Sequence, residues 1–254
     1  MRHTRQSGRD WSSTILDTIL AAAASIDPFV RAGARKLGVS MARFPRLAVI
    51  VQAVRDPFAD VRVMDSEGWT GKDYTTNPDE LARHGLAIQL ISRMHQENRL
   101  TRVLEIACGE GVFTQMLAPH CDALLAVDFS ANALGQAKKR CHEIGNVSFG
   151  LWDLRRDPIP GHFDLIVLMD VLTYVRRPAR QRAVLEKVVA DLRPGDLLLV
   201  GDYRWKKLLE DSWLGKRLLF GAKWVVEGVA AHPKLETLQR ASTDTHIFAA
   251  FRRM

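Results

Sequence analysis

The stretch VLEIACGEGVFT, residues 103 to 114, changes character in its middle. Apolar residues on both sides of Glu105 predict a buried strand, and the small-residue run ACGEG (107–111) follows directly. In a parallel sheet flanked by helices, a ligand binds beyond the carboxyl ends of the strands, and small residues let it approach the backbone closely. The turn after this strand is therefore a candidate ligand site.

A second acid strengthens this interpretation. Asp128 ends the apolar run ALLAVD (123–128), about 20 residues beyond the turn, where an acid can hydrogen-bond the hydroxyls of a ribose. The turn lacks the GxGxxG pattern of NAD-binding proteins, because Ala107 replaces the first glycine and Thr114 the third. Glu105 would repel a pyrophosphate but suits a cation. The sequence therefore favours S-adenosylmethionine, which carries a sulfonium and an ammonium group.

From Thr101 onward, strands and helices alternate along the sequence. Near-continuous apolar runs between helical segments predict an α/β fold with a parallel sheet covered on both faces. The last two runs, 234–243 and 245–253, are joined by about one residue and predict a hairpin, so the final strand should run antiparallel. The other predicted strands are residues 101–106, 123–128, 146–152, 163–170 and 196–202.

The N-terminal part has a different pattern. Segments near 12–25, 29–38 and 43–55 are helix-like, and we expect residues 1–76 to form a helical lid or dimerisation segment. The main domain then covers residues 77–254. It begins with a helix start at Asn77-Pro78, where a capping side chain precedes a proline in the first turn, and this helix is expected to end near Asn98.

Composition narrows the protein class. The 254 residues are 47% hydrophobic and 26% charged, with a net charge of +7 that would attract anions. No apolar run approaches the ~20 residues that span a bilayer, and the first residues do not resemble a secretory signal. The three cysteines form no CxxC pair. They predict free thiols, a cytoplasmic location and no metal site.

The motifs together resemble those of the class I S-adenosylmethionine-dependent methyltransferases. Residues 105–111 match their first motif, usually E/D-x-G-x-G-x-G, except that Ala107 stands at its first glycine. The resemblance implies a Rossmann-like, seven-stranded, mostly parallel sheet with an antiparallel last strand. Further matches are Asp128-Phe129-Ser130, Trp152-Asp153-Leu154, FDLIVLMDVLTYV (163–175) and LRPGDLLLV (192–200).

This resemblance also implies a cofactor-binding set. Asp128 would bind the ribose, Phe129 would pack on the adenine, and Asp153 would accept a hydrogen bond from the adenine amino group. Tyr74 would cover the methionine moiety and contact the sulfonium by cation–π attraction. Cys108 is expected to fill space as a small, partly buried residue, although a thiol at a helix N-terminus can also have a lowered pKa. The full set is Tyr74, Glu105, Ala107, Cys108, Gly109, Gly111, Asp128, Phe129, Trp152, Asp153, Leu154 and Met169.

Within that class, three runs are similar to the nodulation-type N-methyltransferases, which methylate an amino sugar on a chito-oligosaccharide. The runs are DFSANAL (128–134), VSFGLWDLRRD (147–157) and HFDLIVLMDVLTYV (162–175). The match does not cover the first 64 residues. It implies methyl transfer to a nitrogen or oxygen of a small-molecule acceptor, a sugar or a natural product.

Candidate catalytic residues follow the fourth strand, where the methyl group should point. Asp170 would accept a proton or hold an amine, and Tyr174 would shape the pocket. His84, on the first helix of the domain, and His246, at the start of the last strand, are candidate bases. Packing or capping roles account for Asp170 and Tyr174 equally well, and a lone histidine more often has a structural role.

Three other functions stay open. The positive charge favours an RNA or protein methyltransferase, although no RNA-binding module is present and nucleic acid is not the expected partner. The basic aromatic stretch 203–224 resembles an amphipathic helix and leaves open peripheral membrane contact and a lipid substrate. Ala107 permits a non-catalytic cofactor-binding subunit. A homodimer is also compatible with the sequence.

Overall fold

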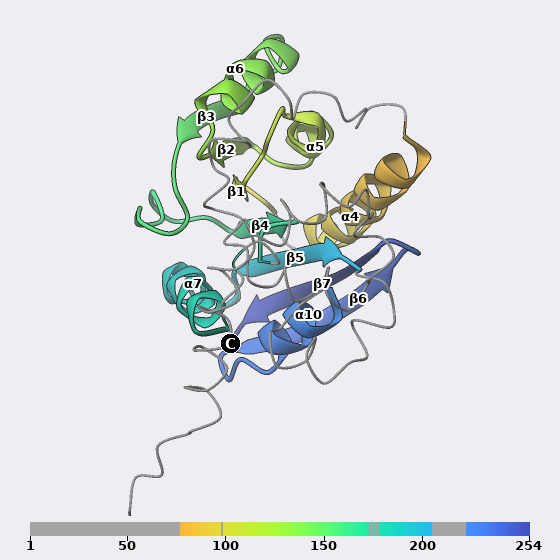
Figure 1. Cartoon of the computed structure of the whole chain (residues 1–254), viewed down its shortest axis with the longest axis vertical. Helices are drawn as coiled ribbons and strands as arrows, with labels where there is room; N and C mark the ends of the chain where they lie inside the picture. Colours follow the sequence, from red (N-terminus) through yellow and green to blue (C-terminus); the bar gives the residue numbers. More distant parts are fainter. Residues whose placement is uncertain (1–76, 98, 173–174, 176–177, 205–221) are drawn as a thin grey trace, which may run out of the picture. The chain divides into compact units, whose positions relative to one another are not determined.

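The computed structural model describes residues 77–97, 99–172, 175, 178–204 and 222–254 (Figure 1). These residues contain a seven-stranded sheet with the order β3-β2-β1-β4-β5-β7-β6. The strands are β1 (Arg102–Ile106), β2 (Ala123–Asp128), β3 (Val147–Leu151), β4 (Leu165–Met169), β5 (Leu197–Tyr203), β6 (Leu235–Ser242) and β7 (His246–Arg253). The described helices are α4 (Pro78–Glu97), α5 (Val112–Leu117), the 3₁₀ turn η3 (Ala118–His120), α6 (Ala131–Arg140), α7 (Pro178–Asp191) and α10 (Ala222–Ala230).

Strand direction agrees with the prediction from the sequence. Strands β1 to β5 pair in parallel, and β7 runs antiparallel to both β5 and β6. The Rossmann-like fold with an antiparallel last strand is therefore confirmed. The predicted helices before residue 77, the boundary at 76/77 and most of the stretch 203–224 lie outside the described residues. The lid, dimer and membrane-contact predictions stay predictions.

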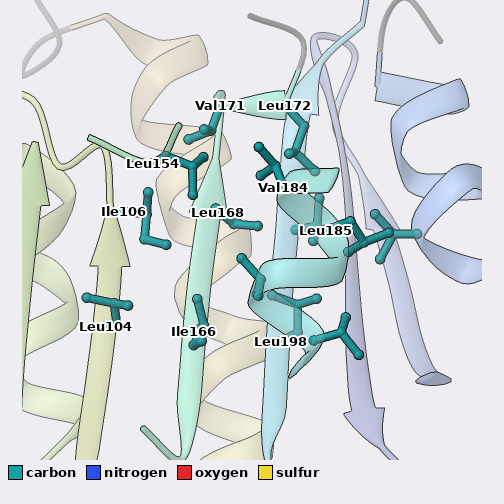
Figure 2. Close-up of a cluster of buried hydrophobic side chains, with 14 of the residues drawn as sticks. Leu104, Ile106, Leu154, Ile166, Leu168, Val171, Leu172, Val184, Leu185 and Leu198 are labelled. Atoms are coloured by element: carbon teal, nitrogen blue, oxygen red, sulfur yellow. The ribbon is translucent and has the colours of Figure 1, made fainter. Parts of the chain in front are cut away.

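Alternation along β4 shows how the sequence builds two cores. Leu165 and Val167 belong to a buried cluster with residues of α4 and α5, whereas Ile166 and Leu168 belong to a second cluster with residues of α7 and α10. Figure 2 shows this second cluster, with Ile166 and Leu168 on the central strand. Since both faces of the strand are covered, the run is apolar throughout rather than alternating with polar residues.

The register brings the functional edge together. Because β7 is antiparallel, its first residue, His246, lies opposite Tyr203 at the end of β5. The carboxyl ends of the parallel strands and the start of β7 therefore share one edge of the sheet.

Helix α4 begins as predicted, since the Asn77 side chain accepts a hydrogen bond of 3.0 Å from the Asp79 backbone N–H.

Among the described helices, none combines the length and apolar character needed to cross a lipid bilayer. The cytoplasmic location remains a prediction from the sequence.

Candidate active site

The turn after β1 has an unusual backbone. Ala107, Gly109 and Gly111 have φ angles of 63°, 55° and 78°, in the left-handed region that favours glycine. The Cys108 N–H donates to the Val127 carbonyl at 3.1 Å, and the Gly111 N–H donates to the Cys108 carbonyl at 3.0 Å. The chain is thus turned sharply by its own backbone, as expected of a cofactor-binding turn.

The two glycines of this turn have different surroundings. A Cβ atom at Gly109 would meet no atom within 4 Å, whereas one at Gly111 would lie 3.0 Å from the Cα and Cβ of Ala137. Gly109 therefore leaves open space in which a ligand can approach the backbone. Packing of the turn against α6 is sufficient to explain Gly111, and its contact with a cofactor stays a prediction.

Asp128 connects two segments at the edge. Its Oδ2 accepts a hydrogen bond of 2.9 Å from the Gly109 N–H, and its Oδ1 accepts one of 2.9 Å from the Ser130 N–H. The Ser130 hydroxyl caps α6 by accepting a 3.1 Å bond from the Ala133 N–H. The carboxylate thus fixes the turn after β1 against the end of β2, where the sequence places the ribose.

Glu105 is buried at the end of β1, and its Oε2 has no hydrogen-bond partner among the described residues. Burial raises the pKa of this carboxyl to about 7, and the charge of Asp128 raises it further, while the Thr114 hydroxyl partly opposes the shift. A buried carboxylate oxygen without a partner is costly to keep ionised. The position is therefore prepared for a positive group.

The structure corrects the pKa suggested for Cys108. Its thiol pKa is raised, mainly by burial and also by the negative charges of Glu105 and Asp128. The sequence-based suggestion of a lowered pKa at a helix N-terminus is wrong, because burial beside two carboxylates outweighs the dipole of the short helix α5. This thiol stays protonated at neutral pH.

The residues after β3 face the core more than the sequence suggests. Trp152 and Leu154 are buried in the cluster that covers α7. The indole N–H of Trp152 donates to the Pro158 carbonyl at 2.8 Å, and the Lys187 ammonium lies 4.9 Å from the ring centre. Their side chains therefore pack in the core beneath this segment, and their contact with a cofactor stays a prediction.

Asp153, between them, is half-buried and already engaged by the chain. Arg155 donates to both of its carboxylate oxygens, with its Nη2 2.6 Å from Oδ2. These hydrogen bonds lower the pKa of Asp153. If Asp153 also binds adenine, its carboxylate must accept from both Arg155 and the adenine amino group. The sequence did not predict Arg155 as a partner, although a basic residue two positions away was a visible signal.

Four other residues complete the site predicted from the sequence. Phe129 and Met169 are half-buried and lie at the ends of β2 and β4, at the functional edge. Tyr74 and Tyr174 lie outside the described residues. The roles of all four in the site stay predictions.

On the other side of β1, Asp170 is the centre of a polar cluster. It follows β4 with a left-handed φ of 54°. Its Oδ2 lies 2.5 Å from Nη1 of Arg83, and its Oδ1 lies 3.2 Å from Nε2 of His246. Arg83 also pairs with Glu80 one turn earlier in α4. The sequence singled out Asp170 but missed Arg83, which is 87 positions away along the chain.

His84 lies between this cluster and the turn. Its ring is 5.4 Å from the ring of Phe113 on α5. Burial lowers its pKa to about 3, and the charge of Arg83 lowers it further. For Asp170, burial alone would raise the pKa, but the close contacts with His246 and Arg83 hold it below its ordinary value. At neutral pH the cluster thus contains a neutral imidazole near an ionised carboxylate.

Comparison with known proteins identifies the family. The family model described as nodulation protein S (NodS) matches residues 80–245, well over half of the chain. The chain belongs to the NodS family. The match spans β1 to β6 and includes Glu105, Asp128 and Asp170, and it ends one residue before His246.

Individual relatives agree with the NodS assignment. Nodulation protein S of Bradyrhizobium diazoefficiens is 31% identical over 116 residues, which are 46% of this chain and 56% of the relative. Magnesium-protoporphyrin O-methyltransferase of Rhodobacter capsulatus is 37% identical over 99 residues, which are 38% of this chain and 44% of that protein. The chain therefore spans about half the length of the curated relatives that it matches.

A solved structure extends the similarity to most of the fold. The crystal structure of the N-methyltransferase NodS from Bradyrhizobium japonicum WM9 in complex with S-adenosyl-L-homocysteine is 27% identical, with a TM-score of 0.60. The alignment covers 72% of this chain and 93% of that one. The NodS family and its methyltransferase fold are thus common to both chains.

Proposed function

We propose that this chain transfers a methyl group from S-adenosylmethionine to a small-molecule acceptor. The observation that carries the proposal is the buried Glu105 carboxylate, whose Oε2 has no hydrogen-bond partner in the part of the chain that the structure describes, behind a left-handed turn that is open at Gly109. A ligand with an ammonium group would neutralise that carboxylate, whereas a pyrophosphate would be repelled by it. The NodS structure with S-adenosyl-L-homocysteine supports the same ligand class.

The residues of this edge fit the cofactor in an ordered way. The Gly109 backbone would approach the ligand, Asp128 would bind its ribose, and Glu105 would face its amino-acid part. S-adenosylmethionine brings a methyl group already activated on a sulfonium. The protein is therefore needed chiefly to align the acceptor and to exclude water.

The acceptor side is proposed at Asp170 and His84. An amine attacks only when it is neutral, and methylation of a primary or secondary amine releases a proton. The pKa of His84, about 3, makes its neutral ring a weak base, so the proton is proposed to leave to water after the transfer, while the Asp170 carboxylate can hold the acceptor N–H. We propose an amine of a sugar or natural product as the acceptor.

A hydroxyl or carboxylate oxygen is the second candidate, because the relative from Rhodobacter capsulatus is an O-methyltransferase. The two candidates are separated by incubating the protein with S-adenosylmethionine and two probes. One is a chito-oligosaccharide with a single free amino group, and the other is its fully N-acetylated form. Methylation of the first alone supports nitrogen, and methylation of both supports oxygen.

Cofactor binding is tested independently of the acceptor. Calorimetry with S-adenosyl-L-homocysteine should show one site per chain, and NAD should show none. Binding of NAD in place of S-adenosyl-L-homocysteine, or binding of neither, would overturn the proposed function.

A further inference from the structure

His246 occupies a constrained position at the functional edge. It is the first residue of β7 and is buried, with a 5% exposed side chain. Its ring meets that of Tyr203 edge-on at 5.4 Å and stacks on Phe248 at 6.0 Å. Two aromatic neighbours from two strands therefore prevent the imidazole from turning.

Both nitrogens of this ring have partners. Nε2 lies 3.2 Å from Oδ1 of Asp170, and Nδ1 lies 2.9 Å from the hydroxyl of Thr245. The ring thus reaches from the β6–β7 hairpin to the carboxylate that follows β4. An imidazole engaged at both nitrogens is poorly placed to act directly on a substrate, and well placed to orient the carboxylate.

Asp170 is held from three elements. Arg83 of α4 contacts one oxygen and His246 of β7 the other, while the Asp170 backbone N–H donates to the Gly201 carbonyl of β5 at 2.8 Å. A left-handed backbone at a residue other than glycine is found where the surrounding structure enforces it, often at functional sites. The orientation of this carboxylate is therefore determined by its neighbours rather than by its own strand.

Exposure distinguishes Asp170 from its partners. The side chain of Asp170 is 26% exposed, compared with 10% for Arg83 and 5% for His246. Within the cluster, Asp170 is thus more exposed than Arg83 and His246. Its Oδ1, which contacts His246, is buried, so the exposed part of the side chain excludes that oxygen.

Resting on the proposed function, we propose that His246 is a positioning residue of the acceptor site. It fixes the Asp170 carboxylate in the orientation in which that carboxylate accepts a hydrogen bond from the N–H or O–H of the nucleophile. The acceptor class follows from this geometry. It is a nucleophile that still carries a hydrogen when it binds, such as a neutral amine, and not one that enters as an anion, because an anion would be repelled by Asp170.

The charges around Asp170 define what losing His246 would do. Among the described residues, Arg83 and His84 face it from α4 and His246 from β7, with Glu80 behind Arg83 and Tyr203 behind His246. Burial opposes ionisation of Asp170, and the contact of its Oδ1 with Nε2 of His246, 3.2 Å away, counteracts burial. Without that contact the pKa of Asp170 rises, and the carboxylate loses one of its two side-chain restraints.

Two substitutions of His246 separate orientation from general packing. In His246→Gln, the amide nitrogen can reach the position of Nε2 and still donate to Asp170, whereas in His246→Asn it reaches only the position of Nδ1. We expect His246→Asn to raise the pKa of Asp170 and to lower turnover about 10- to 100-fold, as for a misplaced catalytic group. His246→Gln should restore most of both.

His232 provides a matched control. It is equally buried, with a 5% exposed side chain, and its Nε2 lies 3.2 Å from Oε1 of Glu186. It precedes β6, whose first residue pairs with Arg253 at the other edge of the sheet. His232→Asn should therefore leave both the pKa of Asp170 and turnover unchanged.

The experiment uses the full chain labelled with ¹³C at its aspartate carboxyl groups, with the Asp170 signal assigned from Asp170→Asn. The pKa of Asp170 is followed by NMR without any acceptor, binding of S-adenosyl-L-homocysteine by calorimetry, and turnover with the amino chito-oligosaccharide across pH. In His246→Asn the acidic limb of the pH–rate profile should move to higher pH, with cofactor affinity changed less than about 2-fold. Should that variant not fold, Thr245→Val, which removes the bond to Nδ1, should give a smaller change of the same sign.

An unchanged pKa of Asp170 in His246→Asn would overturn the inference, as would an equal loss in the His232→Asn control. Equal losses of cofactor affinity and turnover would also overturn it, because they would indicate a purely structural role. Failure of the wild-type protein to bind S-adenosyl-L-homocysteine would instead overturn the proposed function. The NMR result does not depend on activity, so the two failures are distinguishable.

Discussion

The carboxylate of Asp128 holds the backbone of Gly109, whose N–H donates to Oδ2 at 2.9 Å. The same carboxylate holds Ser130 through its other oxygen. One side chain thus positions the open turn and the start of the next helix segment. The acid that the sequence marks as a ribose ligand is therefore also the residue that shapes the site before any ligand arrives.

Asp128→Ala should weaken binding of S-adenosyl-L-homocysteine by about 1–3 kcal/mol, because ribose donors and two backbone N–H groups lose their acceptor. The measurement is calorimetry at fixed pH. Asp122→Ala is the control, since Asp122 is exposed and pairs with Arg99 just before β2, at the opposite edge. Equal affinities of wild type and Asp128→Ala would exclude the placement of the ribose.

Glu105→Gln should change stability in a pH-dependent way. The folded-state pKa of Glu105 is about 7 and the ordinary value is 4.5, so the folded protein binds more protons than the unfolded chain between these values. Wild type therefore loses stability as pH rises from about 4.5 to about 7, by roughly 3.5 kcal/mol at 1.4 kcal/mol per pKa unit. Glutamine does not titrate and escapes this loss.

The stability advantage of Glu105→Gln should thus grow between pH 5 and pH 8, measured by chemical unfolding at a series of pH values without ligand. The same variant should bind S-adenosyl-L-homocysteine more weakly than wild type at pH 8, because the charge opposite the ammonium is gone. A stability difference that is constant across this pH range would show that Glu105 does not titrate there.

Ala107→Gly should stabilise the protein. Ala107 has a φ of 63°, which costs an L-residue roughly 1–2 kcal/mol, and glycine avoids that cost but gives the unfolded chain more freedom. We expect a net gain of up to about 1 kcal/mol in the free energy of unfolding, measured with urea. Ala183→Gly inside α7, exposed and helical, should lose about 0.5–1 kcal/mol instead. A loss in both variants would contradict the argument from φ.

Gly201→Ala should destabilise the sheet. A Cβ atom at this position would lie 2.1 Å from Cδ1 of Phe248. Phe248, on β7, is fully buried in the cluster that includes residues of α4. Overpacking of this kind costs about 1–3 kcal/mol, measured as a lower urea midpoint. Gly85→Ala is the opposite case, because the space around Gly85 in α4 is empty, and it should gain about 0.5–1 kcal/mol. Similar midpoints for the two variants would contradict the packing around Phe248.

Much of the fold was predictable because local patterns determine it. The run from 163 to 170 predicts a fully buried strand, and β4 occupies Leu165–Met169. The hairpin signal around Asp244 predicts the reversed last strand correctly. In both cases burial and turn chemistry are properties of neighbouring residues, so the sequence carries them directly.

The polar contacts were less accessible to sequence reasoning. Arg83 pairs with Asp170 across 87 positions, and this contact depends on how α4 packs on the sheet. The burial of Trp152 depends on Lys187 and Pro158, which reach it from other segments. The raised pKa of Cys108 depends on desolvation, which residue type does not reveal. Each of these properties is set by tertiary packing.

The reversed direction of β7 has a practical consequence for handling the protein. Arg252 pairs with Leu197 at the start of β5, so the exposed Met254 lies at the edge opposite Asp170 and Gly109 (Figure 1). An affinity tag or surface linker attached after Met254 would therefore hold the molecule at the sheet edge opposite the candidate site. Immobilised protein should retain a site directed toward the solution, where acceptors in a screening library can enter it.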